Sequence, residues 1–117
     1  MIEKLKKPIK YFLYARKSSE GEDRQVASVS SQIEELKYLA ERQGLDILDI
    51  LTEEKSAKAP GRPVFNRMME DIQNGKAQGV ICWKLDRLAR NPIDGGEICW
   101  LLQNAVIAHI QTYQRSY

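Results

Sequence analysis

The sequence has no apolar run that approaches the roughly 20 residues of a membrane-spanning helix. Its opening stretch, MIEKLKKPIK, is charged and lacks the apolar centre of a secretory signal peptide. We therefore expect a cytoplasmic protein that has no membrane partner.

Cysteine and histidine are scarce as well. The chain contains two cysteines, Cys82 and Cys99, and one histidine, His109. The cysteines form no CxxC pair and have no histidine at the spacing of a metal site. Because cytosolic thiols stay reduced, we expect no disulfide, and we interpret both cysteines as buried thiols.

Positive charge is in short supply for a protein that would bind nucleic acid. The 18 Lys and Arg residues exceed the 16 Asp and Glu residues so little that the net charge is only +2. A domain that binds nucleic acid through bulk charge usually has more. If the partner is DNA, the positive charge must be local, or another part of the protein must supply most of the binding.

The 117 residues suit one compact domain, and they contain no repeats and no low-complexity tracts. Apolar segments predict buried strands at residues 9–15, 45–51, 79–85 and 105–113. Helical periodicity predicts a helix between each pair of successive strands. This alternation predicts a three-layer α/β fold, in which a mostly parallel sheet has helices on both faces. The expected strand order is 2-1-3-4.

Capping residues predict where the helices begin and end. Ser31 and Glu34 resemble a capping box for the first helix, and Gly44 is a natural stop. Pro63 suits the first turn of the second helix, and Asn91 followed by proline suits the start of the third. The apolar stripe of the second helix is predicted to be core and comprises Phe65, Met68, Met69 and Ile72. Both tryptophans, Trp83 and Trp100, are also interpreted as core residues.

Three polar segments follow the first three strands, and they carry most of the unusual residues. In a parallel sheet the carboxyl ends of the strands meet at one edge, where ligands bind. The segments bring Arg16 and Ser18, then Arg62, then the DRLAR segment to this edge. In an extended strand Arg16 and Ser18 share a face. If DRLAR forms a helical turn, its Asp86, Arg87 and Arg90 share one side.

A hydroxyl among guanidinium groups suits a phosphate, because the planar arginine fork matches two phosphate oxygens. Each residue taken alone also has an ordinary interpretation as a solvated loop, cap or ion-pair residue. The residues by themselves therefore indicate an anion or phosphate site at the sheet edge.

The segments YARKSS, SVSSQ, KSAKAPGRPVF and WKLDRLAR, in this order, resemble the catalytic domain of serine recombinases, the resolvase/invertase family. The resemblance runs from about residue 11 to residue 117. The spacing of SEGEDRQ is most similar to the large serine recombinases, which include transposon and phage integrases.

The resemblance implies that Ser18 attacks a DNA phosphodiester and forms a 5′-phosphoserine link, which is later rejoined. Asp86 matches an acid for the leaving 3′-oxygen, and Gln25 and Gln32 match two supporting glutamines. The family's active-site arginines match Arg16, Arg62, Arg87 and Arg90. No metal, ATP or other cofactor is implied. Ser19 is the alternative nucleophile, but it would point to the opposite face of an extended strand.

The implied partners are double-stranded DNA and, in the complete protein, further copies of the chain in a dimer or tetramer. Residues 1–117 are expected to be an N-terminal catalytic domain that stops before the family's long dimer helix and DNA-binding domains, and to be inactive alone. Three alternatives stay open: a nucleotide-binding or regulatory α/β domain, a serine hydrolase with His109 as base, and a non-catalytic dimerisation fragment.

Overall fold

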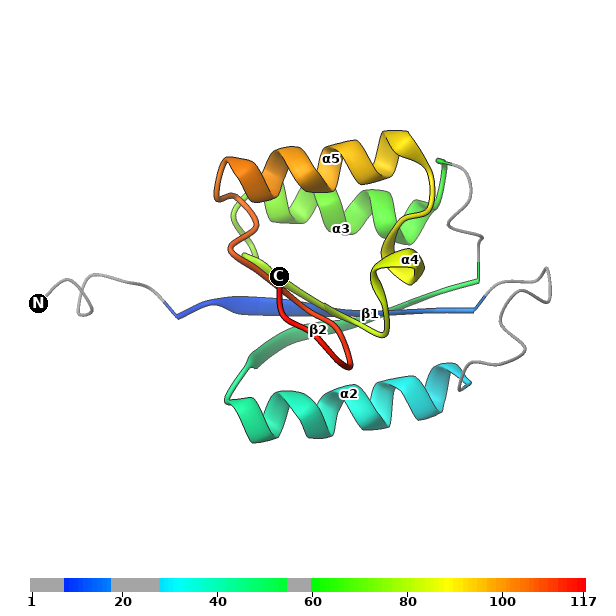
Figure 1. The fold of residues 1–117 in the computed structure, drawn as a ribbon, viewed down its shortest axis with the longest axis vertical. Helices are drawn as coiled ribbons and strands as arrows, with labels where there is room; N and C mark the ends of the chain where they lie inside the picture. Colours follow the sequence, from blue (N-terminus) through cyan, green and yellow to red (C-terminus); the bar gives the residue numbers. More distant parts are fainter. Residues whose placement is uncertain (1–7, 18–27, 55–59) are drawn as a thin grey trace, which may run out of the picture.

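A computed structural model describes residues 8–17, 28–54 and 60–117 of the chain. In it, strands and helices alternate along the sequence, apart from two successive helices before the last strand (Figure 1). The strands are β1 (Lys10–Arg16), β2 (Asp46–Glu53), β3 (Gly79–Cys82) and β4 (His109–Gln111), and the helices are α2 (Val29–Gln43), α3 (Pro63–Gln73), α4 (Leu85–Leu88) and α5 (Pro92–Gln103).

The four strands form one parallel sheet in the order β2-β1-β3-β4. This confirms the predicted fold class and strand order. Helix α2 covers one face of the sheet, while α3 and α5 lie side by side on the other face (Figure 1). Of the helices described, none is both long and apolar enough to cross a bilayer.

Alternation along β1 divides the core into two clusters. Tyr11, Leu13 and Ala15 pack in the cluster that contains the buried side chains of α2. Phe12 and Tyr14 pack with the apolar stripe of α3 and with α5. Because side chains alternate along a strand, Arg16 belongs to the second face and points toward the helices α3, α4 and α5.

The helix ends follow the predicted capping chemistry with one exception. Gly44 ends α2 in the left-handed conformation, at φ 69°, and Asn91 caps α5 by accepting a hydrogen bond from the Asp94 backbone N–H. The predicted capping box is wrong. Ser28 caps α2 instead, because its side chain accepts a hydrogen bond from the Ser31 backbone N–H.

Two predicted strands are shorter than expected. Strand β3 ends at Cys82, because α4 begins at Leu85. Strand β4 begins only at His109, since the chain turns after α5 and the N–H groups of Val106 and Ile107 both donate to Leu101 O.

The interpretation of Trp100 and Cys99 as buried is wrong. Trp100 is 64% exposed, and Cys99 is exposed as well. Both lie on α5, which carries apolar residues around most of its circumference, so the sequence does not reveal which side faces the sheet. Ile98 and Leu101 form the buried side. Cys82 is buried as predicted, and Trp83 is half-buried.

The last residues fold back along β4. The backbones of Ile110 and Tyr117 exchange two hydrogen bonds, at 3.1 and 2.7 Å, and Gln111 forms an antiparallel bridge with Ser116. The tail therefore covers the edge of β4 that does not pair with β3.

Candidate active site

The carboxyl edge of the sheet is where the predicted site residues gather. Strand β1 ends at Arg16, the next backbone N–H, of Lys17, donates to Glu53 O at the end of β2, and α4 follows β3 at the same edge (Figure 1). Ser18 and Gln25 lie outside the described residues. Their predicted roles therefore stay predictions.

Arg16 is buried, with 1% of its surface exposed. Its Nε donates to Arg87 O at 3.0 Å, which joins the end of β1 to α4. On the other side, Gln32 in the first turn of α2 donates from Nε2 to Arg16 O at 3.4 Å. The structure thus brings three residues of the predicted site together: Arg16, Gln32 and Arg87.

Arg62 is equally buried and sits immediately before α3. Its Nη1 donates to the Tyr14 hydroxyl at 3.0 Å, and its Nη2 donates to Leu88 O at 2.6 Å and to Asp94 Oδ2 at 3.0 Å. The guanidinium also lies 3.9 Å from the centre of the Phe65 ring. Arg62 therefore connects β1, α4 and α5 through one planar group.

Glu53, at the end of β2, is a buried residue of this edge that the sequence analysis missed. Its carboxylate accepts from the Tyr14 hydroxyl at 2.6 Å and from the backbone N–H groups of Val64 and Phe65 at 2.8 and 3.0 Å. It therefore caps α3, whose own N-cap residue, Arg62, offers no side-chain cap. The sequence does contain an indication of such a residue. An arginine at the N-cap position has no side-chain acceptor, so the helix N-terminus requires an acceptor from elsewhere in the chain.

Tyr14 stays neutral in this network. Burial raises the pKa of its hydroxyl well above the ordinary value, and the hydrogen bond to Glu53 adds to the rise, while Arg62 opposes it. A neutral hydroxyl can donate to Glu53 and accept from Arg62 at the same time.

The segment after β3 differs from the predicted helical turn. Helix α4 ends at Leu88, because Ala89 adopts an extended conformation. Arg87 is buried, whereas Asp86 and Arg90 are exposed. The predicted one-sided arrangement of these three residues is therefore wrong, since Arg90 lies beyond the helix and Asp86 and Arg87 have different environments.

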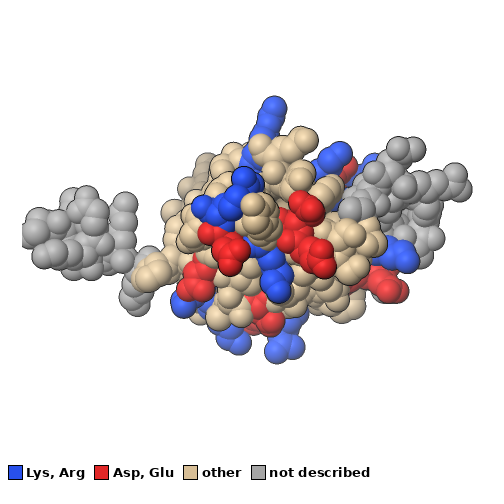
Figure 2. Space-filling model, turned by 90° about the horizontal axis from the view of Figure 1, so that it is seen from below, with Lys and Arg blue, Asp and Glu red and all other residues tan. Residues whose placement is uncertain are grey.

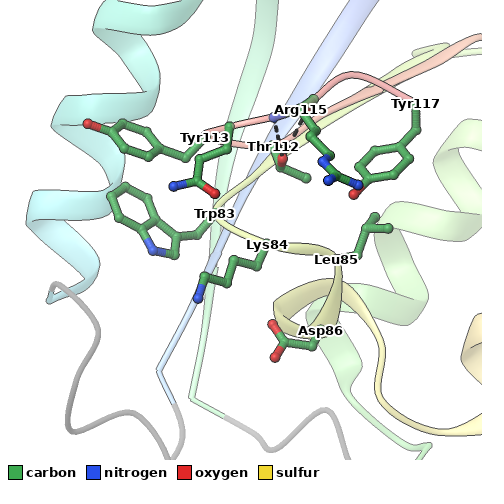
Figure 3. Close-up of a pocket in the computed structure, with 9 residues that line it drawn as sticks. Trp83, Lys84, Leu85, Asp86, Thr112, Tyr113, Arg115 and Tyr117 are labelled. Atoms are coloured by element: carbon green, nitrogen blue, oxygen red, sulfur yellow. Dashed lines mark hydrogen bonds between the residues drawn. The ribbon is translucent and has the colours of Figure 1, made fainter.

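A pocket of about 390 Å³ opens beside α4 (Figure 3). Trp83 and Tyr113 stack on one side of it, with ring centres 4.4 Å apart. Charged side chains also reach it, among them Lys84, Asp86 and Arg115. Asp86 thus lines this pocket from α4.

His109 lies at the opposite end of the strands, where β3 and β4 begin. Its Nδ1 is 2.6 Å from the Tyr11 hydroxyl, and its backbone is level with Gly79 at the start of β3. Arg16 is five residues beyond Tyr11, roughly 16 Å along an extended strand. His109 is therefore out of reach as the base of a hydrolase site at the carboxyl edge.

Comparison with known proteins decides the family. The sequence matches the family model described as "Resolvase, N terminal domain" over residues 11–114. The chain belongs to this resolvase family. A search of curated proteins gave no match.

Solved structures agree with the resolvase assignment. The N-terminal catalytic domain of TP901-1 integrase is 28% identical, with a TM-score of 0.71 over 89% of this chain and 77% of that one. A resolvase family site-specific recombinase from Streptococcus pneumoniae is 29% identical, with a TM-score of 0.70 over 91% of this chain and 72% of the other. The catalytic domain of ISC1926 TnpA, an IS607-like serine recombinase, shares the fold at 20% identity, with a TM-score of 0.69 over 89% of this chain and 68% of that one. The resolvase chain therefore has the fold of a serine recombinase catalytic domain, as the motifs predicted.

Proposed function

We propose that this chain is the catalytic domain of a site-specific DNA recombinase in which Ser18 is the nucleophile. The observation that supports it is the meeting of Arg16, Arg62 and Arg87 at the edge where β1 ends, two residues before Ser18. Three separate segments deliver these arginines, and two of them are fully buried. Buried arginines are rarely kept without a partner or a task.

In the proposed reaction the Ser18 oxygen attacks the phosphorus of a DNA phosphodiester. A serine–phosphorus bond forms, the bond to the 3′-oxygen breaks, and the DNA 5′ end stays attached as a phosphoserine. The serine hydroxyl loses a proton and the leaving 3′-oxygen gains one. Asp86, which is exposed at this edge, is the proposed group for the second transfer.

Positive charge near the phosphate would stabilise the transition state, in which negative charge is spread over the phosphoryl oxygens. Arginine stays charged throughout the physiological pH range. Because the phosphoserine retains the energy of the broken bond, the reverse reaction needs no ATP, and the proposal requires neither a metal nor another cofactor.

The partners follow from the same proposal. The substrate is double-stranded DNA, and recombination requires further copies of the chain in a dimer or tetramer, since four strands must be cut and rejoined. Basic and acidic side chains are mixed over the α2 face, with no large patch of one sign (Figure 2). This face is therefore a poor candidate for the DNA-binding surface, and contacts near the carboxyl edge fit better.

The first prediction is that Ser18→Ala abolishes the covalent protein–DNA link without unfolding the protein. The experiment uses the protein as its gene encodes it and duplex fragments of the DNA that carries the gene. Denaturation with detergent preserves a covalent link, which is then detected by gel shift and located by mass spectrometry of the Ser18 peptide.

Ser19→Ala is the matched control, because it removes the neighbouring hydroxyl, and it should retain the link. A link that persists in Ser18→Ala, or that maps to Ser19, would contradict the proposed nucleophile. Circular dichroism of both variants establishes that each is folded.

A further inference from the structure

Asp94, in the first turn of α5, is a buried carboxylate to which the sequence analysis gave no role. Its side chain is 4% exposed. Together with Glu53 it is one of two buried acidic residues in the part of the chain that the structure describes. A carboxylate is seldom buried unless it is paired, so its contacts indicate what it does.

Two groups hold the Asp94 carboxylate. Oδ2 accepts from Arg62 Nη2 at 3.0 Å and from Asn91 Nδ2 at 2.8 Å. The backbone N–H of Asp94 in turn donates to Asn91 Oδ1 at 2.9 Å. Asp94 and Asn91 therefore fix each other at the start of α5, with one carboxylate oxygen aimed at Arg62.

The nitrogen that Asp94 holds also contacts the DRLAR segment. Arg62 Nη2 donates to Leu88 O at 2.6 Å, and Arg16 Nε donates to Arg87 O at 3.0 Å. Two guanidinium groups thus bind consecutive carbonyls at the C-terminal end of α4. These are carbonyls that a helix end leaves without a partner inside the helix.

Helix α4 depends on such outside contacts. It has four residues, and a single helical turn is unstable in isolation. Its position sets where Asp86 and Arg87 lie, and it sets where the chain leaves toward Arg90. A change in the Arg62 guanidinium is therefore transmitted to all three residues.

We infer that Asp94 is a positioning residue: through Arg62 it fixes α4 and with it Asp86, Arg87 and Arg90. The inference rests on the proposed recombinase function. It assigns Asp94 no contact with DNA, and it gives Arg62 a role inside the protein, as the link between α5 and α4.

The second prediction concerns Asp94→Asn, which keeps the size of the side chain and removes its charge. The rate of covalent link formation at saturating DNA should fall at least tenfold, while the apparent Kd for DNA changes less than twofold. Amide hydrogen exchange at Arg87 and Ala89, whose N–H groups close α4 onto Lys84 O and Leu85 O, should become at least tenfold faster.

Glu97→Gln is the matched control. Glu97 lies three residues further along α5, and its contact is with the exposed Gln73 side chain, at 2.9 Å. This variant should change the rate and the α4 exchange less than twofold. Normal link formation and normal α4 protection in Asp94→Asn would overturn the inference.

A milder variant covers the case in which Asp94→Asn fails to fold. Asn91→Ser keeps a good N-cap residue for α5 and removes the amide that donates to Asp94. Its rate and exchange should change in the same direction, but less than in Asp94→Asn. An unchanged rate and unchanged α4 exchange in Asn91→Ser would overturn the inference, because this variant loosens the hold on Asp94 while α5 stays capped.

The two proposals fail in different ways. Absence of any link to Ser18 in the unmodified protein refutes the proposed function, whereas the exchange measurement still tests the coupling of Asp94 to α4. Normal linking to Ser18 with unchanged exchange in Asp94→Asn refutes only the positioning role.

Discussion

At the scale of single residues, environment decides chemistry more than residue type does. The chain has two cysteines, and they differ in their exposure to solvent. Cys82 is buried in β3, and burial, with a smaller contribution from the nearby charge of Asp86, raises the pKa of its thiol to about 12. Cys99 is exposed on α5.

The third prediction is that a thiol reagent modifies one cysteine in each folded chain. The thiolate is the reactive form, so at pH 8 the buried Cys82 should react at least 100-fold more slowly than Cys99. Titration with a chromogenic disulfide, before and after adding denaturant, should count one and then two thiols. Cys99→Ser should remove the fast phase, and a fast phase that survives in this variant would contradict the burial of Cys82.

At the scale of elements, a helix is capped from a distant strand. Helix α3 begins after an arginine that is directed inward, and the acceptor for its first N–H groups comes from Glu53 in β2. Because Glu53 accepts from the first N–H groups of α3, the Arg62 side chain is left to donate to Tyr14 and Asp94.

The fourth prediction is that Glu53→Gln lowers the free energy of unfolding by about 2 kcal/mol, because it replaces charge-assisted hydrogen bonds and places an amide donor among donors. Glu54→Gln is the control, since Glu54 is exposed and next in sequence, and it should change the free energy by less than about 0.5 kcal/mol. Urea unfolding measures both. Equal losses would show that Glu53 is no more important than a surface charge.

Comparison of these elements shows what local sequence can reveal. The strand order, the start of α3 at Pro63 and the end of α2 at Gly44 were predictable, because they rest on periodicity, proline and glycine. The prediction that the DRLAR segment forms one continuous helical turn was wrong. Helix α4 ends at Leu88, and its end is held by guanidinium groups from segments that are remote in sequence. The gathering of arginines at one edge followed from strand direction. The binding of Arg16 and Arg62 to backbone carbonyls of α4 could not be predicted in this way, because both arginines lie far from α4 in sequence.

At the scale of the whole molecule, the core contains several weak acids that must stay protonated. Burial raises the pKa of Tyr11 and Tyr14 in β1 and of Cys82 in β3. In the unfolded chain these groups titrate near 10 for tyrosine and 9 for cysteine. The native state therefore holds protons that the unfolded state releases.

The fifth prediction is that stability falls in alkaline solution. Below pH 9 this contribution is fully present, and above pH 9 the unfolded thiol loses its proton while native Cys82 keeps its proton until about pH 12. Between pH 9 and pH 12, Cys82 should lower the free energy of unfolding by up to about 1.4 kcal/mol per pH unit, and the two tyrosines should add to this decline only above pH 10. Urea unfolding at pH 8, 9 and 10 measures the slope.

Cys82→Ala is the comparison for this slope. The variant is less stable at every pH, but its decline between pH 9 and 10 should be shallower than that of the unmodified protein. Parallel curves would contradict the assigned role of the thiol.

The tail that folds back along β4 has a consequence for how the protein behaves in a crowded solution. A bare strand at the border of a sheet invites a neighbouring molecule to add its own strand and start a fibril. Here Tyr117 and Ser116 occupy that border on the β4 side. On the β2 side, Asp49 places a negative charge on the strand, and an identical copy that paired there would bring a like charge close to it. Both borders of the sheet thus discourage stacking of chains into aggregates.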